Sequence, residues 1–149
     1  MADDLVFTVD KFIFRVATDR YYTAEGMWAK PENDHVRVGI SDYLQQRSGD
    51  VAFAEIKPIG TLLQPGDELA VIETIKVNIS LASPVAGRVS ETNPIMETSP
   101  EAINQDPYGM GWLAQLEVSG DKSRMEHLLD PGAYYSMIKQ EAEQEVNKE

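Results

Sequence analysis

The chain contains no cysteine among its 149 residues. Disulfide bonds, thiolate metal sites and cysteine nucleophiles are therefore excluded, and any redox chemistry must come from an attached group. Basic residues are also scarce, because 13 Lys and Arg oppose 25 Asp and Glu, for a formal net charge of −12. This charge has the wrong sign for binding nucleic acid or an anionic membrane, so we expect basic protein surfaces as partners.

The usual catalytic and metal-binding motifs are missing as well. His35 and His127 lie far apart, and neither has a ligand-type residue four positions away. No G-x-S-x-G, G-x-x-x-x-G-K-[ST] or G-x-G-x-x-G motif occurs, so the sequence gives no signal for acyl transfer or phosphate binding. The first 20 residues place acids before a broken apolar run, unlike a signal peptide or a membrane span. We therefore expect a cytoplasmic, monomeric protein that is not an enzyme by itself.

Short apolar runs separated by glycine and proline predict many short strands. With 42% hydrophobic residues, a chain of this length has room for one domain with a real core. The predicted strands are Leu5 to Val9, Phe12 to Val16, Tyr21 to Trp28, Val36 to Ile40, Val51 to Ile56, Arg88 to Glu91 and Leu113 to Val118. The pattern indicates an antiparallel sandwich or flattened barrel with peripheral helices.

Capping signals predict the short helices. Asp42 is the predicted N-cap of a helix over about Tyr43 to Arg47, with Gln45 at the capping-box position and Gly49 as a left-handed exit. The segment Ser99 to Asn104 begins with a serine before a proline, which predicts a second short helix.

The C-terminal region carries two further capping signals. The box Ser123-x-x-Glu126 predicts a helix through Leu129, and Asp130-Pro131 predicts the start of another. In the second helix one face is shared by Tyr134, Met137 and Ile138. We expect an N-terminal extension (1–20) packing on the domain, the domain itself (21–120), C-terminal helices (121–140) and a frayed acidic tail (141–149).

Lys76 has an unusual setting in the most regular apolar segment. From Leu69 to Leu81 every odd position except Glu73 is apolar, which predicts one continuous strand with one packed face. Lys76 lies on the opposite face and is the only basic residue between Lys57 and Arg88. A lysine amine is charged and hydrated, yet it can be acylated to a neutral amide. The alternation alone is equally typical of a solubilising lysine on an exposed strand.

A longer series of motifs resembles the glycine cleavage H protein family. The segment Glu73-Thr74-Ile75-Lys76-Val77, followed by Ser83-Pro84-Val85-Ala86-Gly87-Arg88-Val89, is similar to the lipoylation hairpin of that family. The flanking matches are Val38-Gly39-Ile40-Ser41-Asp42-Tyr43, Gly49-Asp50-Val51, Gly60-Thr61, Gly66-Asp67-Glu68 and Asp106-Pro107-Tyr108-Gly109-x-Gly111-Trp112-Leu113. They occur in order between about Tyr21 and Tyr135, which makes the series far more specific than a single E-x-x-K.

The resemblance implies a mainly β, hybrid barrel-sandwich fold with a few short peripheral helices and a C-terminal helix. It places Lys76 at the tip of a tight hairpin, where lipoic acid would be joined to it through an amide. Glu73 is our candidate for recognition by the lipoate-attaching enzyme. The apolar set expected to anchor the base of the arm is Ile75, Val77, Ile79 and Leu81. Biotin carriers flank their lysine with methionine, so this sequence argues against biotin.

Two departures from the family bear on the pathway. The family typically has a His-Glu pair before the tryptophan, whereas this chain has Glu25-Gly26-Met27-Trp28, and about twenty extra residues come first. Both features resemble the lipoate-binding proteins of heterodisulfide-reductase-like sulfur oxidation. Our first interpretation is therefore a carrier of sulfur intermediates, with heterodisulfide-reductase-like subunits and sulfur transferases as partners.

Two alternatives remain open at this point. One is glycine cleavage, in which the arm carries an aminomethyl group among glycine decarboxylase, aminomethyltransferase and dihydrolipoyl dehydrogenase. The other is an unlipoylated β-sandwich that serves as a binding or regulatory module.

Overall fold

The computed structural model describes residues 4–118 and 125–147 and is mainly β, as predicted. Its strands are β1 (Leu5–Val9), β2 (Phe12–Val16), β3 (Tyr21–Tyr22), β4 (Met27–Glu32), β5 (His35–Ile40), β6 (Val51–Ile56), β7 (Leu62–Leu63), β8 (Glu68–Thr74), β9 (Asn78–Ala82), β10 (Gly87–Thr92) and β11 (Ala114–Glu117). Its helices are α1 (Asp42–Ser48), the 3-10 helix η1 (Pro94–Glu97), α2 (Ala102–Gln105) and α3 (Pro131–Asn147).

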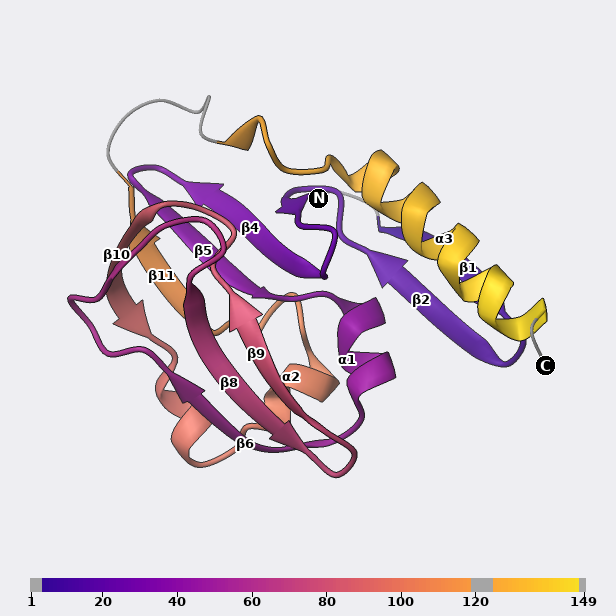
Figure 1. Cartoon of the computed structure of the whole chain (residues 1–149), viewed down its shortest axis with the longest axis horizontal. Coiled ribbons are helices and arrows are strands. Elements are labelled where there is room, and N and C mark those ends of the chain that lie inside the picture. Colours follow the sequence, from indigo (N-terminus) through magenta and orange to yellow (C-terminus); the bar gives the residue numbers. More distant parts are fainter. Residues whose placement is uncertain (1–3, 119–124, 148–149) are drawn as a thin grey trace.

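Two antiparallel sheets enclose the main core (Figure 1). One has the strand order β3-β4-β5-β11-β10-β7 and the other the order β6-β8-β9. Their facing side chains form one apolar cluster, in which Val38, Ile72, Val89 and Leu116 are fully buried. Burial of these β-branched and aliphatic side chains supplies the main driving force for the fold.

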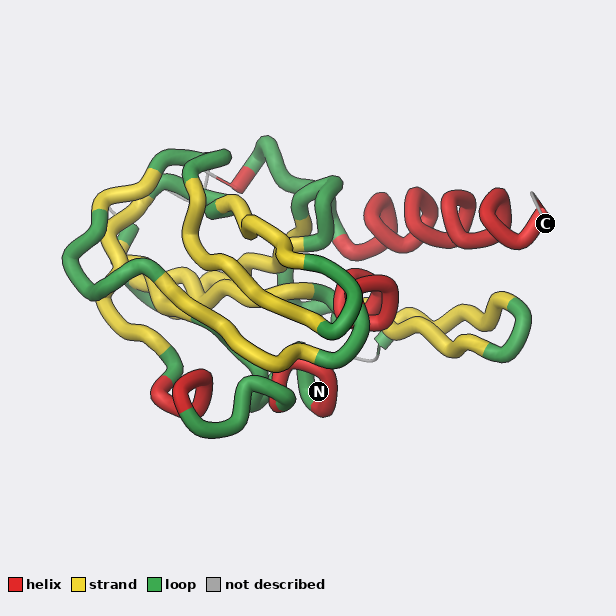
Figure 2. Tube along the Cα trace, turned by 60° about the horizontal axis from the view of Figure 1, so that its bottom comes forward, coloured by secondary structure: helices red, strands yellow, loops and turns green. Residues whose placement is uncertain are grey.

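The N-terminal hairpin and the C-terminal helix share a second, more aromatic cluster, the hairpin cluster, whose buried residues include Phe7, Phe14, Tyr22, Tyr134 and Ala142. Within the described residues, strands β1 and β2 pair only with each other, and they contact α3 and α1 (Figure 2). Phe7 and Phe14 are buried there, with ring centroids 5.1 Å apart. The rings of Tyr22 and Tyr134 are stacked, with centroids 4.3 Å apart. These aromatic contacts join the two ends of the chain to the domain.

Helix α1 is capped one residue earlier than the sequence predicts. Ser41, not Asp42, is the N-cap, and its Oγ accepts a hydrogen bond from the Leu44 N–H at 3.1 Å. Ser41 has the extended backbone that an N-cap needs, whereas the Asp42 carboxylate accepts the Arg15 N–H of β2 at 2.9 Å. Gly49 ends the helix with φ of 90°, as predicted.

The predicted continuous strand from Leu69 to Leu81 is wrong, because it is two strands joined by a turn. A bulge between Glu68 and Ala70 also shifts the alternation, so that Ala70 and Ile72 face the core from β8. The partners of these two residues in β9 are Leu81 and Ile79, respectively. The alternation of apolar and polar residues in the sequence continues through both the bulge and the turn, although the side chains change faces there. The alternation alone therefore revealed neither feature.

Helix α3 begins at Pro131, as predicted, and continues to Asn147. The predicted fraying beyond Gln140 is therefore wrong for residues 141–147. Ala142 is buried against the hairpin cluster, and Glu145 forms an ion pair with Arg47 of α1. Of the helix predicted from Ser123 to Leu129, the start lies outside the described residues and the described part forms no α-helix. Instead, Leu129 forms a β-bridge with Tyr22. None of the helices in the two described ranges is long and apolar enough to span a membrane.

Candidate functional site

Lys76 lies in the tight turn between β8 and β9, where the resemblance placed it. Thr74 closes this turn: its N–H donates to the Val77 carbonyl at 2.8 Å. The Thr74 Oγ1 accepts the N–H of Lys76 at 3.1 Å and the N–H of Val77 at 3.0 Å. The backbone around Lys76 is therefore held by one threonine, while the lysine side chain is exposed.

A second segment supports the turn from the side of α1. A methyl group on the Gly49 α-carbon would lie 3.4 Å from Cδ and 3.5 Å from Cε of Lys76, so the aliphatic part of the lysine lies on this glycine. The Asp50 carbonyl accepts the Ile75 N–H at 3.2 Å. We call Gly49, Asp50 and Val51 the platform, since this connection between α1 and β6 contacts the lysine turn and supports it.

The charged end of Lys76 has no partner in the parts of the chain that the structure describes: its Nζ makes no ion pair or hydrogen bond within residues 4–118 and 125–147. Glu73 is exposed on β8 and pairs with Asn78 across the hairpin and with Phe53 of β6. The two candidate residues from the sequence are thus brought to the same end of the hairpin, with Glu73 in the last strand pair before the turn and Lys76 in the turn itself.

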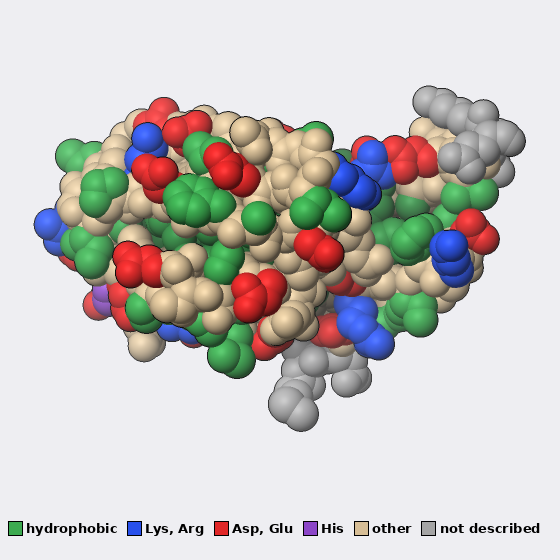
Figure 3. All heavy atoms as spheres, turned by 90° about the horizontal axis from the view of Figure 1, so that it is seen from below, with side chains coloured by type: hydrophobic (Ala, Val, Ile, Leu, Met, Phe, Trp, Pro, Cys, Tyr) green, Lys and Arg blue, Asp and Glu red, His purple; other side chains and the backbone are tan. Residues whose placement is uncertain are grey.

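Exposed apolar side chains flank the lysine in the turn and lie on the neighbouring strand β6. Ile75 is 75% exposed, and both Val77 and Phe53 are 48% exposed. The expected anchoring of the arm's base is therefore right for Leu81, which is buried, and for the half-buried Ile79, but wrong for Ile75 and Val77. The turn points these two side chains toward solvent. The face on which this turn lies carries hydrophobic side chains interspersed with Asp and Glu (Figure 3).

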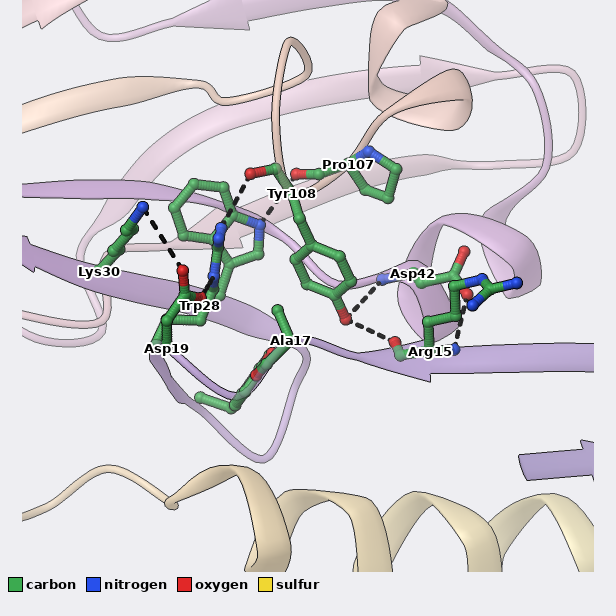
Figure 4. A network of polar contacts seen from close by, with 10 residues as sticks. Arg15, Ala17, Asp19, Trp28, Lys30, Asp42, Pro107 and Tyr108 are labelled. Carbon is green, nitrogen blue, oxygen red and sulfur yellow. Dashed lines mark hydrogen bonds and ion pairs between the residues drawn. The ribbon is translucent and has the colours of Figure 1, made fainter. Parts of the chain in front are cut away.

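A buried polar network joins the N-terminal extension to the domain on another side (Figure 4). Arg20 is only 6% exposed, donates to the Asp19 carboxylate at 2.8 Å and to the Tyr108 carbonyl at 3.0 Å, and lies 4.5 Å from the Trp28 ring. The Trp28 indole N–H donates to the Pro107 carbonyl at 3.0 Å. Such contacts of an arginine with aromatic faces are favourable when water is excluded.

Two groups of this network, Tyr108 and Asp19, have displaced pKa values. Burial raises the pKa of Tyr108 to about 12, so its hydroxyl stays protonated at neutral pH and donates to the Arg15 carbonyl at 2.7 Å. Burial acts to raise the pKa of Asp19, but hydrogen bonding and charge from Arg20, with the charge of Lys30, hold it below its ordinary value. All these groups have partners, and no cluster of three or more metal-ligating side chains occurs in the described parts of the chain. We therefore assign this network a structural role.

Sequence reasoning missed the residues that support Lys76 from outside its own hairpin. Gly49 was interpreted as the exit of a helix and as part of a family match, but not as a contact of Lys76, from which it is 27 residues away in sequence. Asn104 received no role, although its side chain binds the platform. No local pattern reports such contacts, because they depend on how α1 and α2 pack together.

A small β domain that presents a single exposed lysine on a tight hairpin has the architecture of a carrier domain. Comparison with known proteins makes this specific: the model of the glycine cleavage H-protein family matches residues 20–141. The chain belongs to this family, as its motifs suggested.

Individual relatives agree with the family match. The glycine cleavage system H protein of Thermus thermophilus is 41% identical over 127 residues, which cover 85% of this chain and 98% of the relative. The probable glycine cleavage system H protein of Natronomonas pharaonis is 41% identical over 84% of this chain and 98% of its own length. A crystal structure of the H protein from Mycobacterium marinum is similar with a TM-score of 0.72 and 28% identity, over 83% of this chain and 99% of that one. This similarity confirms the predicted barrel-sandwich hybrid fold.

These comparisons also delimit what is particular to this chain. The family match begins at residue 20, after the β1–β2 hairpin. The hairpin is therefore an addition to the family domain, packed against α1 and α3.

Proposed function

We propose that this protein is a lipoyl carrier in which Lys76 is the acceptor. The observation that supports this most directly is the lysine turn: its backbone is fixed by Thr74, its stem lies on Gly49 and its amine has no partner in the described residues. In the attachment step the Nζ amine would attack an activated lipoyl carboxyl group. An amide bond forms between Nζ and the lipoyl carbonyl carbon, and the bond from that carbon to the activating group breaks. The activating group is released as the leaving group, and the nitrogen loses a proton. The chain would then act as a carrier, with chemistry taking place on partner enzymes.

The relatives favour glycine cleavage as the pathway. Their names place them in the glycine cleavage system, whereas none of them supports the sulfur-oxidation interpretation that we preferred from the sequence. The arm would then carry an aminomethyl group, with glycine decarboxylase, aminomethyltransferase and dihydrolipoyl dehydrogenase as partners. The acidic surface of the chain suits basic docking clefts on such enzymes.

One structural feature keeps the sulfur pathway as a second candidate. The position of the family's His-Glu pair is occupied by Gly26 and Met27, of which Met27 is 2% exposed in the core. Gly26 has φ of 104°, and a methyl group there would lie 2.9 Å from Leu44 Cβ. A side chain at position 26 would therefore clash with Leu44, and a charged one at position 27 would be buried in the core, so a function that depends on the family's His-Glu pair would be impaired.

Intact-mass measurement tests the carrier proposal. Protein from a lipoate-replete host should carry the mass of one lipoyl group, and Lys76→Arg should lose it. Lys57→Arg is the matched control, because Lys57 is the preceding lysine and is engaged in an ion pair with Glu68. An unmodified wild-type chain would instead favour the third alternative, a binding or regulatory module.

A second assay separates the two pathways. Purified lipoylated protein is added to glycine decarboxylase, and carboxyl exchange on glycine is followed with an established H protein as the positive control. Stimulation comparable with the control supports glycine cleavage. Absence of stimulation, with lipoylation verified by mass, would support the sulfur pathway. The cytoplasmic location and monomeric state stay predictions.

A further inference from the structure

We infer that Asn104 is a positioning residue that fixes the platform beneath Lys76. Its Nδ2 donates to the Gly49 carbonyl at 2.9 Å and to the Gln45 Oε1 at 3.0 Å, and its Oδ1 accepts the Val51 N–H at 2.9 Å. One side chain from α2 therefore binds both ends of the platform and the last full turn of α1. This inference rests on the proposal that Lys76 is the lipoyl acceptor.

The platform reaches the lysine turn through two contacts. Gly49 lies against the stem of Lys76, and Asp50, between the two residues that Asn104 binds, accepts the Ile75 N–H. Gly49 is also the position with the greatest backbone freedom in the segment, since glycine alone adopts its φ of 90° and ψ of −173° without strain. Without the Asn104 amide, the carbonyl of Gly49 would lose this partner and the platform would sample other backbone conformations.

Rigidity of this platform matters because Lys76 has to enter the active site of an attaching enzyme. The turn has few other restraints: Ile75 and Val77 are exposed, and only Thr74 closes it. A loosened turn must be ordered again on binding, which costs affinity, while the reactivity of the amine is unchanged once it is bound. Loss of Asn104 is therefore expected to raise the KM for the carrier and to leave kcat unaltered.

The chain provides a matched control in Asn93. Its Nδ2 donates to the carbonyls of Met110 and Trp112, both at 2.8 Å, and its Oδ1 accepts the Ile95 N–H at 3.2 Å. Asn93 thus also makes two donated bonds and one accepted bond. None of its three partners belongs to the platform or to the lysine turn.

The experiment measures lipoylation of unmodified wild type, Asn104→Ala and Asn93→Ala by a lipoate-protein ligase supplied with ATP and lipoate. Thermal unfolding is recorded for each full-length variant, together with hydrogen exchange at the Ile75 amide. We expect Asn104→Ala to raise the KM for the carrier about threefold to tenfold, an ordering cost of roughly one kcal/mol, with unchanged kcat and faster exchange at Ile75. Asn93→Ala should lose stability but keep the wild-type KM.

Asn104→Asp is a second variant of nearly the same shape, in which the bond from Val51 is retained and the two donated bonds are lost. It should show the same rise in KM. An unchanged KM in both Asn104 variants, or an equal rise in Asn93→Ala, would overturn the inference. So would unfolding of both Asn104 variants at the assay temperature, because Asn104 would then act on the whole fold. If wild type itself were not lipoylated, the proposed function would fail instead, so the two failures are distinguishable.

Discussion

The stem of Lys76 lies on Gly49, with Cδ placed 3.4 Å from where a β-carbon on this glycine would be. The lysine of the candidate site is therefore supported by the end of a helix in another part of the chain. Its own hairpin holds only its backbone.

Gly49→Ala should disturb the lysine turn in addition to the fold. Its φ of 90° makes any side chain strained, and the new methyl group would be in van der Waals contact with the Lys76 stem, so a backbone shift that relieves the strain would move the surface on which the lysine lies. We expect a loss of about 1–3 kcal/mol in the free energy of unfolding and a lower rate of lipoylation. Gly60→Ala is the control, because its φ of 98° imposes similar strain with no atom within 4 Å of the new group. Denaturant unfolding and ligase kinetics measure both effects; equal lipoylation of the two variants would contradict the platform contact.

Glu73→Gln tests whether a carboxylate beside the lysine turn is recognised. The substitution preserves shape and removes one exposed charge. We expect slower lipoylation with unchanged unfolding, since an exposed charge contributes little to stability but can guide docking. Glu55→Gln, an exposed residue of the neighbouring strand β6, should lipoylate at the wild-type rate. If both variants behaved like wild type at low ionic strength, Glu73 would have no part in recognition.

Much of the β architecture could be predicted because polar residues, glycine and proline interrupt the short apolar runs, as Asp10 and Lys11 do after Leu5–Val9 and Gly49 and Asp50 do before Val51–Ile56. The segments Leu5–Val9 and Val51–Ile56 are found with their predicted bounds, and α3 begins at the predicted proline. The prediction of one continuous strand from Leu69 to Leu81 failed because the alternation continues unbroken through the bulge near Ala70 and the turn at Lys76. Only the family resemblance located that turn. Tertiary contacts such as those of Asn104 left no sequence signal, because they join segments far apart in the chain.

The C-terminal helix provides a direct test of a corrected prediction. A frayed tail would tolerate any substitution at Ala142, whereas the structure buries this residue in the hairpin cluster. Ala142→Arg should lower the free energy of unfolding by about 1–3 kcal/mol, because a large charged side chain cannot fit there without displacing its neighbours. Glu143→Arg, on the exposed side of the same helix, should have little effect. Equal stability of the two variants in denaturant would indicate that the helix is not packed at this point.

The buried tyrosines predict a loss of stability in alkali. In the unfolded chain a tyrosine ionises near pH 10, while burial raises the pKa of Tyr108 to about 12 in the folded protein. Burial also raises the pKa of Tyr22 and Tyr134. The folded state therefore keeps these protons to a higher pH than the unfolded state does. The resulting contribution to the free energy of unfolding is complete below pH 10 and is lost as the pH rises through the folded pKa. The loss is at most about 1.4 kcal/mol per pH unit for each tyrosine.

Tyr108→Phe isolates one of these groups. At pH 8 the variant should be less stable by about 1–2 kcal/mol, because the Arg15 carbonyl and the Asp42 N–H lose their hydroxyl partner. Between pH 10 and 12 its stability should fall less steeply than that of wild type, so the two unfolding curves approach each other. Denaturant titrations at each pH measure the slopes, and parallel curves for wild type and Tyr108→Phe would show that the Tyr108 hydroxyl is not buried in solution.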